Sequence, residues 1–125
     1  MRGLVLGLVT GVGLGLGIGP GVVMAGDWQV LDGAAISRAL SARVLQYAGG
    51  ARQDFKADGR TLYESGGGSS GGGPSWGSWR VEGDRYCSVW PPSDRWACFE
   101  VAARGLEIRF REDGADTIGR YVDLN

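Results

Sequence analysis

The chain has 125 residues, with 13 Lys and Arg, 14 Asp and Glu, and no His, which gives a formal net charge of -1 at pH 7. This balance provides no basic stripe for nucleic acid and no polybasic patch for a membrane surface. Without His the chain lacks the commonest general base and the commonest metal ligand, so the sequence indicates no catalytic constellation, no metal site and no cofactor.

Residues 1–25 have the layout of a secretory signal peptide. The run from Gly3 to Gly26 has no charged residue, and Val23-Met24-Ala25 offers compact residues before a cut after Ala25. Cleavage would leave 26–125 as a single domain, periplasmic or secreted, with no stable membrane span. A retained anchor is the alternative, because about 20 apolar residues span a bilayer, although the many glycines weaken such a helix.

A short amphipathic helix is predicted over residues 33–42. Asp32 precedes it as a typical N-cap, whose carboxylate accepts hydrogen bonds from the first turn. Ile36, Leu40 and Val44 then recur at intervals of four residues. Because this apolar stripe is narrow, we expect the helix to lie on a sheet.

After the helix the apolar pattern changes to a period of two, which is typical of strands with one buried face. A first hairpin is predicted over residues 55–62. It turns at Asp58-Gly59, a dipeptide that tolerates the positive φ of a tight turn. A two-residue turn there would place Phe55 opposite Leu62.

Two more hairpins are predicted. One covers residues 79–86 and turns at Gly83-Asp84, and the other covers residues 99–110 and turns near Arg104-Gly105. A last strand is predicted over residues 117–122. The residues expected on the buried face are Val81, which lies opposite Tyr86, and Phe99, Val101, Leu106, Ile108 and Phe110. The expected fold is mainly β, in the α+β class. A short N-terminal helix is followed by an antiparallel meander of about seven or eight strands, as an open sheet or a small barrel.

A stretch of Gly, Ser and Pro at residues 65–75 interrupts the meander. Its composition predicts a flexible loop. Loop-closure cost rises slowly with length, so an expanded loop between neighbouring strands is the favoured interpretation. A mobile lid, or a linker between two binding units, is the alternative.

Cys87 and Cys98 are the only cysteines. Folding the chain about Pro92-Ser93 places them opposite each other, as it does Ser88 and Ala97. Cross-strand neighbours are close enough for a disulfide, and paired cysteines in an exported chain favour one. The spacing is not the Cys-x-x-Cys of a redox pair, and two thiolates without His make a poor zinc site.

Four residues near this hairpin are candidate binding residues. Trp90, Arg95 and Trp96 belong to the hairpin itself, and Trp79 precedes it. Trp and Arg are enriched among the residues that dominate binding energy, so a rigid turn carrying them could grip a partner. In the alternative interpretation the Trp side chains pack into the core, with Arg95 stacked on Trp90.

The run from Gly77 to Cys87, followed by Trp90 and Cys98, resembles a pattern in small exported proteins of proteobacteria. In those proteins a Gly-x-Trp strand, a Gly-Asp turn and a Cys…Trp…Cys hairpin follow a short helix and an Asp-Gly hairpin. The resemblance covers most of residues 26–125 and implies a periplasmic protein, without supplying an activity or a catalytic residue. The Gly/Ser stretch departs from that compact pattern.

The sequence favours a non-enzymatic binding or accessory protein of the cell envelope. Its partner would be a protein, a glycan or a small apolar ligand, held by the sheet face or the Cys87–Cys98 hairpin. Inhibition of a secreted enzyme through the Trp-Pro-Pro segment is an alternative. A small acid-dependent hydrolase is less favoured, because its candidate acids, at 82–84 and 112–116, stand beside turn glycines where acids are ordinarily solvated. The 112–116 run also lacks the full loop of a calcium site.

Overall fold

The structure is a computed structural model that describes residues 26–66 and 73–122. The predicted signal peptide, 1–25, lies outside the described residues, as do residues 67–72 of the predicted Gly/Ser loop. No helix within the described ranges has the length and apolar character that a membrane span requires. These ranges are mainly β and contain one α-helix, α3 (Gly33–Leu40), and one 3-10 turn, η1 (Ala48–Gly50).

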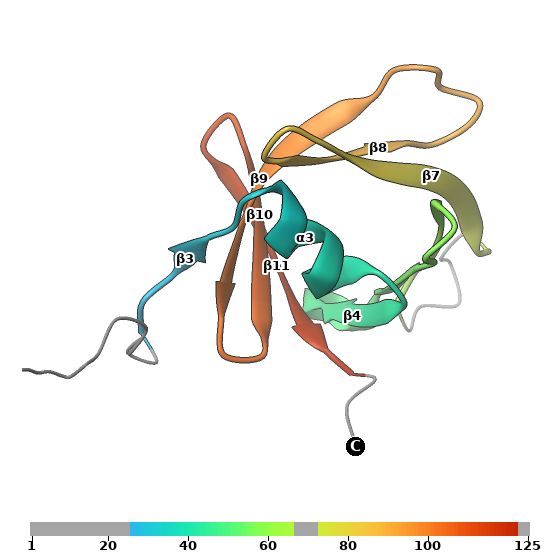
Figure 1. The fold of residues 1–125 in the computed structure, drawn as a ribbon. Helices are drawn as coiled ribbons and strands as arrows, with labels where there is room; N and C mark the ends of the chain where they lie inside the picture. The colour runs from blue at the N-terminus through green and yellow to red at the C-terminus, as the bar shows by residue number, and fades with distance from the viewer. Residues whose placement is uncertain (1–25, 67–72, 123–125) are drawn as a thin grey trace, which may run out of the picture.

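Eight antiparallel strands form a closed barrel (Figure 1). Each strand from β4 to β10 pairs with the next along the chain, and β11 pairs back with β4. A further short strand, β3, lies beside β9. The bounds are β3 (Gln29–Val30), β4 (Arg43–Tyr47), β5 (Arg52–Phe55), β6 (Arg60–Glu64), β7 (Ser75–Glu82), β8 (Arg85–Val89), β9 (Ala97–Arg104), β10 (Glu107–Glu112) and β11 (Ala115–Tyr121).

Helix α3 is shorter than predicted and is not the first element of the described residues. It begins after Asp32, whose carboxylate accepts a 2.9 Å hydrogen bond from the Ala35 backbone N–H, as an N-cap should. It ends at Leu40 instead of residue 42, because Ser41 is already non-helical and Ala42 has a φ of 61°. The strand β3 precedes it, which corrects the expectation of an N-terminal helix.

Helix α3 closes one end of the barrel, where it packs against β4, β7 and β8 (Figure 1). Ile36 and Leu40 are fully buried there. The start of the helix is tied to the β7–β8 turn, since the Gly33 N–H donates to a carboxylate oxygen of Asp84 over 2.8 Å. A Cβ on Gly33 would lie 2.2 Å from the carbonyl oxygen of Gly83, so this approach requires glycine.

Buried apolar side chains fill the barrel next to the helix. This core contains two helix residues and inward-facing residues of six strands, namely Ile36, Leu40, Leu45, Phe55, Trp79, Tyr86, Val101, Ile108 and Phe110, with Tyr121 packed against it. Since the helix and these side chains occupy one end, any space inside the barrel must lie at the other.

Two of the predicted registers are confirmed and one is wrong. Val81 lies opposite Tyr86, and Cys87 lies opposite Cys98. Phe55, however, pairs with Thr61 and not with Leu62.

The reason for the shifted register is a longer turn between β5 and β6. The Lys56 N–H donates to the Arg60 carbonyl, which leaves a three-residue loop in which Gly59 has a φ of 97°. Adding one residue to a turn moves the following side chains to the other face of the strand. Thr61 is therefore buried inside the barrel, while Leu62 is on the outer side.

The third hairpin has the expected position with one exception. Val101, Ile108 and Phe110 are buried, but Leu106 lies in the β9–β10 turn and is 44 % exposed. The last strand covers Ala115–Tyr121, slightly earlier than predicted.

Candidate functional site

A cavity of about 720 Å³ opens at the barrel end opposite α3, which we call the barrel mouth. All eight barrel strands contribute to its wall, and so does the loop between β8 and β9. Its aromatic residues are Tyr47, Tyr63, Tyr86, Trp90, Phe99 and Phe110. An eight-stranded barrel is just wide enough to be filled by its own side chains or to hold one small ligand, and here part of the interior is open.

Two glycines make room for the largest rings at the mouth. A Cβ on Gly77 would lie 2.6 Å from the Trp90 ring, and a Cβ on Gly119 would lie 2.9 Å from the Tyr47 ring. Both glycines are inward-facing strand residues, so each ring occupies the volume that a side chain would otherwise fill. The Trp90 and Tyr47 rings therefore lie against the inner wall of the barrel and leave the opening free.

Gln53 anchors a hydrogen-bond network at the inner end of the cavity. Its Nε2 donates to Thr61 Oγ1 over 3.0 Å and to Tyr86 Oη over 3.2 Å, and its Oε1 accepts from Tyr47 Oη over 2.7 Å. Thr61 Oγ1 in turn donates to the Asp54 carbonyl. Burial of an amide is costly without hydrogen bonds, so this network fixes the orientation of Gln53.

The phenols that contact Gln53 remain neutral. Burial is the main cause that raises the pKa of Tyr47, and nearby Tyr86 and Tyr63 raise it further. Burial also raises the pKa of Tyr86. The inner end of the cavity is therefore uncharged over the physiological pH range.

The rim carries one carboxylate, and its charge is balanced. Asp116 accepts hydrogen bonds of 2.7 Å and 3.1 Å from the Arg111 guanidinium. The hydrogen bond from Arg111 is the main cause that lowers the pKa of Asp116. Among the residues that line the cavity, none presents an unpaired charge to a ligand.

The four predicted binding residues occupy different environments. Trp90 lines the cavity, contacts the Tyr63 ring edge-on at 6.2 Å and donates from Nε1 to Ser88 Oγ. Trp79 is 7 % exposed and lies in the core. Arg95 is exposed in the β8–β9 loop. The structure brings none of the other three to the cavity wall beside Trp90.

An arginine does stack on a hairpin tryptophan, but the pair differs from the expected one. The guanidinium of Arg80 lies 3.8 Å from the ring centre of Trp96, on the outside of the barrel. Arg80 also pairs with Glu82 on the same strand. The stacking of Arg95 on Trp90 is not observed, since Trp90 points into the barrel mouth.

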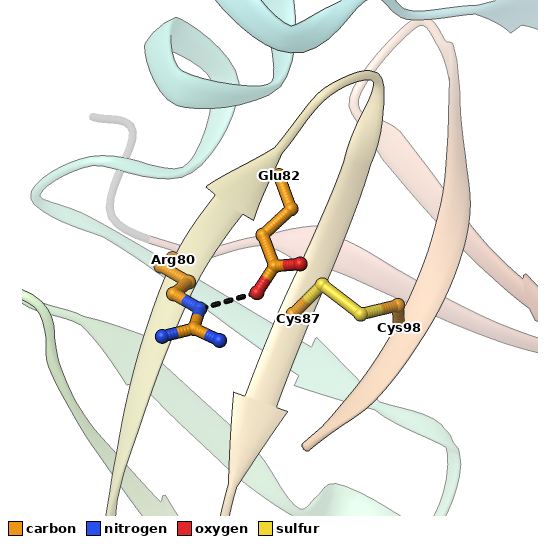
Figure 2. Close-up of a disulfide and its surroundings, with 4 residues drawn as sticks. All are labelled: Arg80, Glu82, Cys87 and Cys98. Carbon is orange, nitrogen blue, oxygen red and sulfur yellow. Dashed lines mark hydrogen bonds and ion pairs between the residues drawn. A yellow bond between two sulfur atoms is a disulfide. The ribbon is translucent and has the colours of Figure 1, made fainter.

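Cys87 and Cys98 form a disulfide with an S–S distance of 2.04 Å between β8 and β9 (Figure 2). Arg80 and Glu82 of β7 lie beside it on the outer face of the barrel (Figure 2). The Glu82 carboxylate and both sulfurs lie within 4.8 Å of one another. The sulfurs are bonded to each other, so this cluster offers no thiolate pair to a metal.

Three of the acids that a hydrolase would use have structural partners. Glu82 pairs with Arg80, Asp84 caps the start of α3, and Asp116 pairs with Arg111. A general acid at neutral pH needs a raised pKa, whereas that of Asp116 is lowered.

Most residues of the cavity wall were missed by sequence reasoning. Tyr47 and Gln53 attracted no functional prediction, and Phe99 and Phe110 were assigned to the core. The available signal was glycine inside two strand patterns, at 77 and 119, because glycine in a strand often marks the close approach of another group. No protein-family model, curated protein or solved structure matches the chain significantly.

Proposed function

We propose that the protein is an exported binding protein that holds one small, uncharged ligand in the barrel mouth. The observation that carries this proposal is the cavity of about 720 Å³ with a wall built by all eight barrel strands. Small-molecule sites typically measure about 300–1,000 Å³ and are mostly apolar with a few placed polar groups. The barrel mouth has this composition, with six aromatic residues around Gln53.

Export is supported by two independent features of the chain. The N-terminal residues have the layout of a signal peptide. The Cys87–Cys98 disulfide is consistent with an oxidising compartment such as the periplasm. A carrier or accessory role in the cell envelope fits both features.

A cavity-blocking variant tests the proposal. Ser75 is exposed and lies on the wall of the barrel mouth, so Ser75→Trp should fill part of the opening. Ser37 is an exposed serine on α3 at the closed end, and Ser37→Trp is the matched control. The probe is Prodan, an uncharged naphthalene dye whose emission shifts to the blue in apolar sites.

Wild type and Ser37→Trp should bind Prodan saturably, and Ser75→Trp should bind it at least about tenfold more weakly, as expected when a bulky group occupies the site. Thermal unfolding of each variant checks that the fold is retained. Equal binding by Ser75→Trp and Ser37→Trp, or no saturable binding by wild type, would refute a ligand site in the barrel mouth.

Inhibition of a secreted enzyme is a second candidate, supported by the shape of the β8–β9 loop. Residues 91–95 are exposed, the loop projects from the barrel (Figure 1), and the disulfide fixes the strands at its base. Arg95→Ala should then relieve inhibition of a susceptible hydrolase in a panel of envelope proteases and glycosidases. If wild type inhibits none of them, this candidate fails while ligand binding stands.

A further inference from the structure

The Gln53 amide leaves an acceptor, and no donor, available at the inner end of the cavity. Both hydrogens of Gln53 Nε2 are used, by Thr61 and Tyr86. Its Oε1 accepts one hydrogen bond, from Tyr47, although a carbonyl oxygen has two lone pairs. Tyr47 gives its only hydrogen to Gln53, so its own oxygen can still accept. A ligand that reaches this point finds oxygen lone pairs and no free N–H from the amide.

The walls above these acceptors are aromatic. The Tyr47 and Tyr63 rings are stacked at 6.4 Å with an interplanar angle of 29°, and Trp90 meets Tyr63 edge-on. Phe99 and Phe110 also line the cavity. Such a wall favours a ligand ring, which can add offset-stacked or edge-to-face contacts. A sugar would need donors as well as acceptors for its many hydroxyls, and the Gln53 amide has no donor left to offer.

The electrostatics of the barrel mouth disfavour an ionic ligand. The phenols of Tyr47 and Tyr86 stay protonated, and Asp116 is balanced by Arg111. A charged ligand would enter without a counter-charge, and burial of an unpaired charge is costly.

We propose that the ligand is an uncharged aromatic compound with a hydroxyl or N–H group, which donates a hydrogen bond to Gln53 Oε1 while its ring packs against Tyr63 and Trp90. This inference rests on the proposed function, because it specifies what the same cavity binds.

Three naphthalene compounds that differ in one group provide the test. 2-Naphthol has a hydroxyl donor and is neutral at pH 7, 2-methoxynaphthalene has the same ring without the donor, and 2-naphthoate is an anion. Binding is followed by NMR through the indole N–H signals of the five tryptophans. Trp90 is the one tryptophan on the cavity wall, so its signal should move, while those of Trp28 and Trp96 on the outside should not.

We expect 2-naphthol to bind about five- to tenfold more tightly than its methyl ether, the usual effect of one net hydrogen bond. 2-Naphthoate should bind more weakly than either. Gln53→Leu should reduce the difference between 2-naphthol and its ether while Prodan still binds, and Tyr47→Phe, which keeps the amide oxygen, should preserve the difference. The ratio of the wild-type affinities for 2-naphthol and its ether tests the donor requirement even if Gln53→Leu fails to fold.

Equal affinities for 2-naphthol and its ether, or tightest binding of 2-naphthoate, would overturn the donor requirement while the ligand site itself stands. A shift of the Trp90 signal by glucose, with none by 2-naphthol, would overturn the aromatic assignment and indicate a glycan. Failure of every compound, including Prodan, would instead refute the proposed function.

Discussion

The substitution Gly77→Ala should displace Trp90 from the barrel mouth. The added Cβ would lie 2.6 Å from the Trp90 ring and 2.6 Å from the Val89 carbonyl oxygen, whereas ordinary contact begins at 3.4 Å. Both contacts must therefore open by about 0.8 Å, the difference between these distances. The Trp90 ring must move away from β7, and the β7–β8 ladder, in which Val89 lies opposite Ser78, must also adjust.

The cost of this displacement has two sources. The Trp90 ring loses its edge-on contact with Tyr63 and its hydrogen bond to Ser88. Overpacking of an ordered interior typically costs about 1–3 kcal/mol. For a domain of about 100 residues, each kcal/mol lowers the thermal midpoint by roughly 4–8 °C, so we expect a fall of at least about 4 °C.

Thermal unfolding, combined with the NMR signal of the Trp90 indole N–H, measures both effects. Gly73→Ala is the control, because a Cβ there meets nothing within 4 Å and should change neither quantity. If Gly77→Ala melts with wild type and the Trp90 signal keeps its position, the packing of the ring against Gly77 is not what shapes the barrel mouth.

Three further predictions concern the disulfide and two carboxylates. Replacing Cys87 and Cys98 by Ser should lower the free energy of unfolding in urea by about 3 kcal/mol, because the bridge closes a loop with a sequence separation of 11. Wild type with reductant should unfold at the same urea concentration as the variant. Asp84→Ala should cost about 1 kcal/mol as a lost helix cap, and an equally stable variant would contradict the capping role. The Asp116 carboxyl should titrate below 3.8 by NMR, and Arg111→Ala should return its pKa toward that value. Because the pKa of Asp116 is lowered in the folded state, the stabilisation from this pair is present above the unfolded-state pKa and is lost as the pH falls through the folded-state pKa. An unchanged Asp116 titration in Arg111→Ala would show that Arg111 is not the cause of the lowered pKa.

Short turns made parts of the fold predictable from the sequence. The Gly-Asp turn leaves two residues between β7 and β8, which fixes Val81 opposite Tyr86. The pairing of Cys87 with Cys98 could be predicted for a related reason, because one register both aligns the sulfurs and forms a hairpin. In both cases local chemistry determines the pairing.

The Asp58-Gly59 turn shows why the same reasoning failed nearby. The dipeptide fits a two-residue turn, but the chain uses a three-residue loop closed by Lys56 and Arg60. Nothing in the sequence separates the two loops, because Gly59 can adopt a positive φ in either. The burial of Thr61, which Gln53 contacts, could therefore not be predicted.

The cavity could not be predicted because its aromatic residues have the same alternation as core residues. Phe99 and Phe110 face the barrel interior in the same way as Val101 and Ile108. Which of these residues lie beside open space depends on barrel closure and on the position of α3. Both are long-range properties that periodicity along a strand does not report.

Barrel closure also determines when the protein can protect its interior during folding. Only three residue pairs of β11 and β4 join the two ends of the meander, with Gly119 opposite Tyr47 at one of them. Until that seam forms, β4 and β11 each present a free edge to other chains, and such edges promote aggregation. The seam joins strands far apart in sequence, which slows folding. The three pairs of the β11–β4 seam therefore decide how long these edges stay open to other chains.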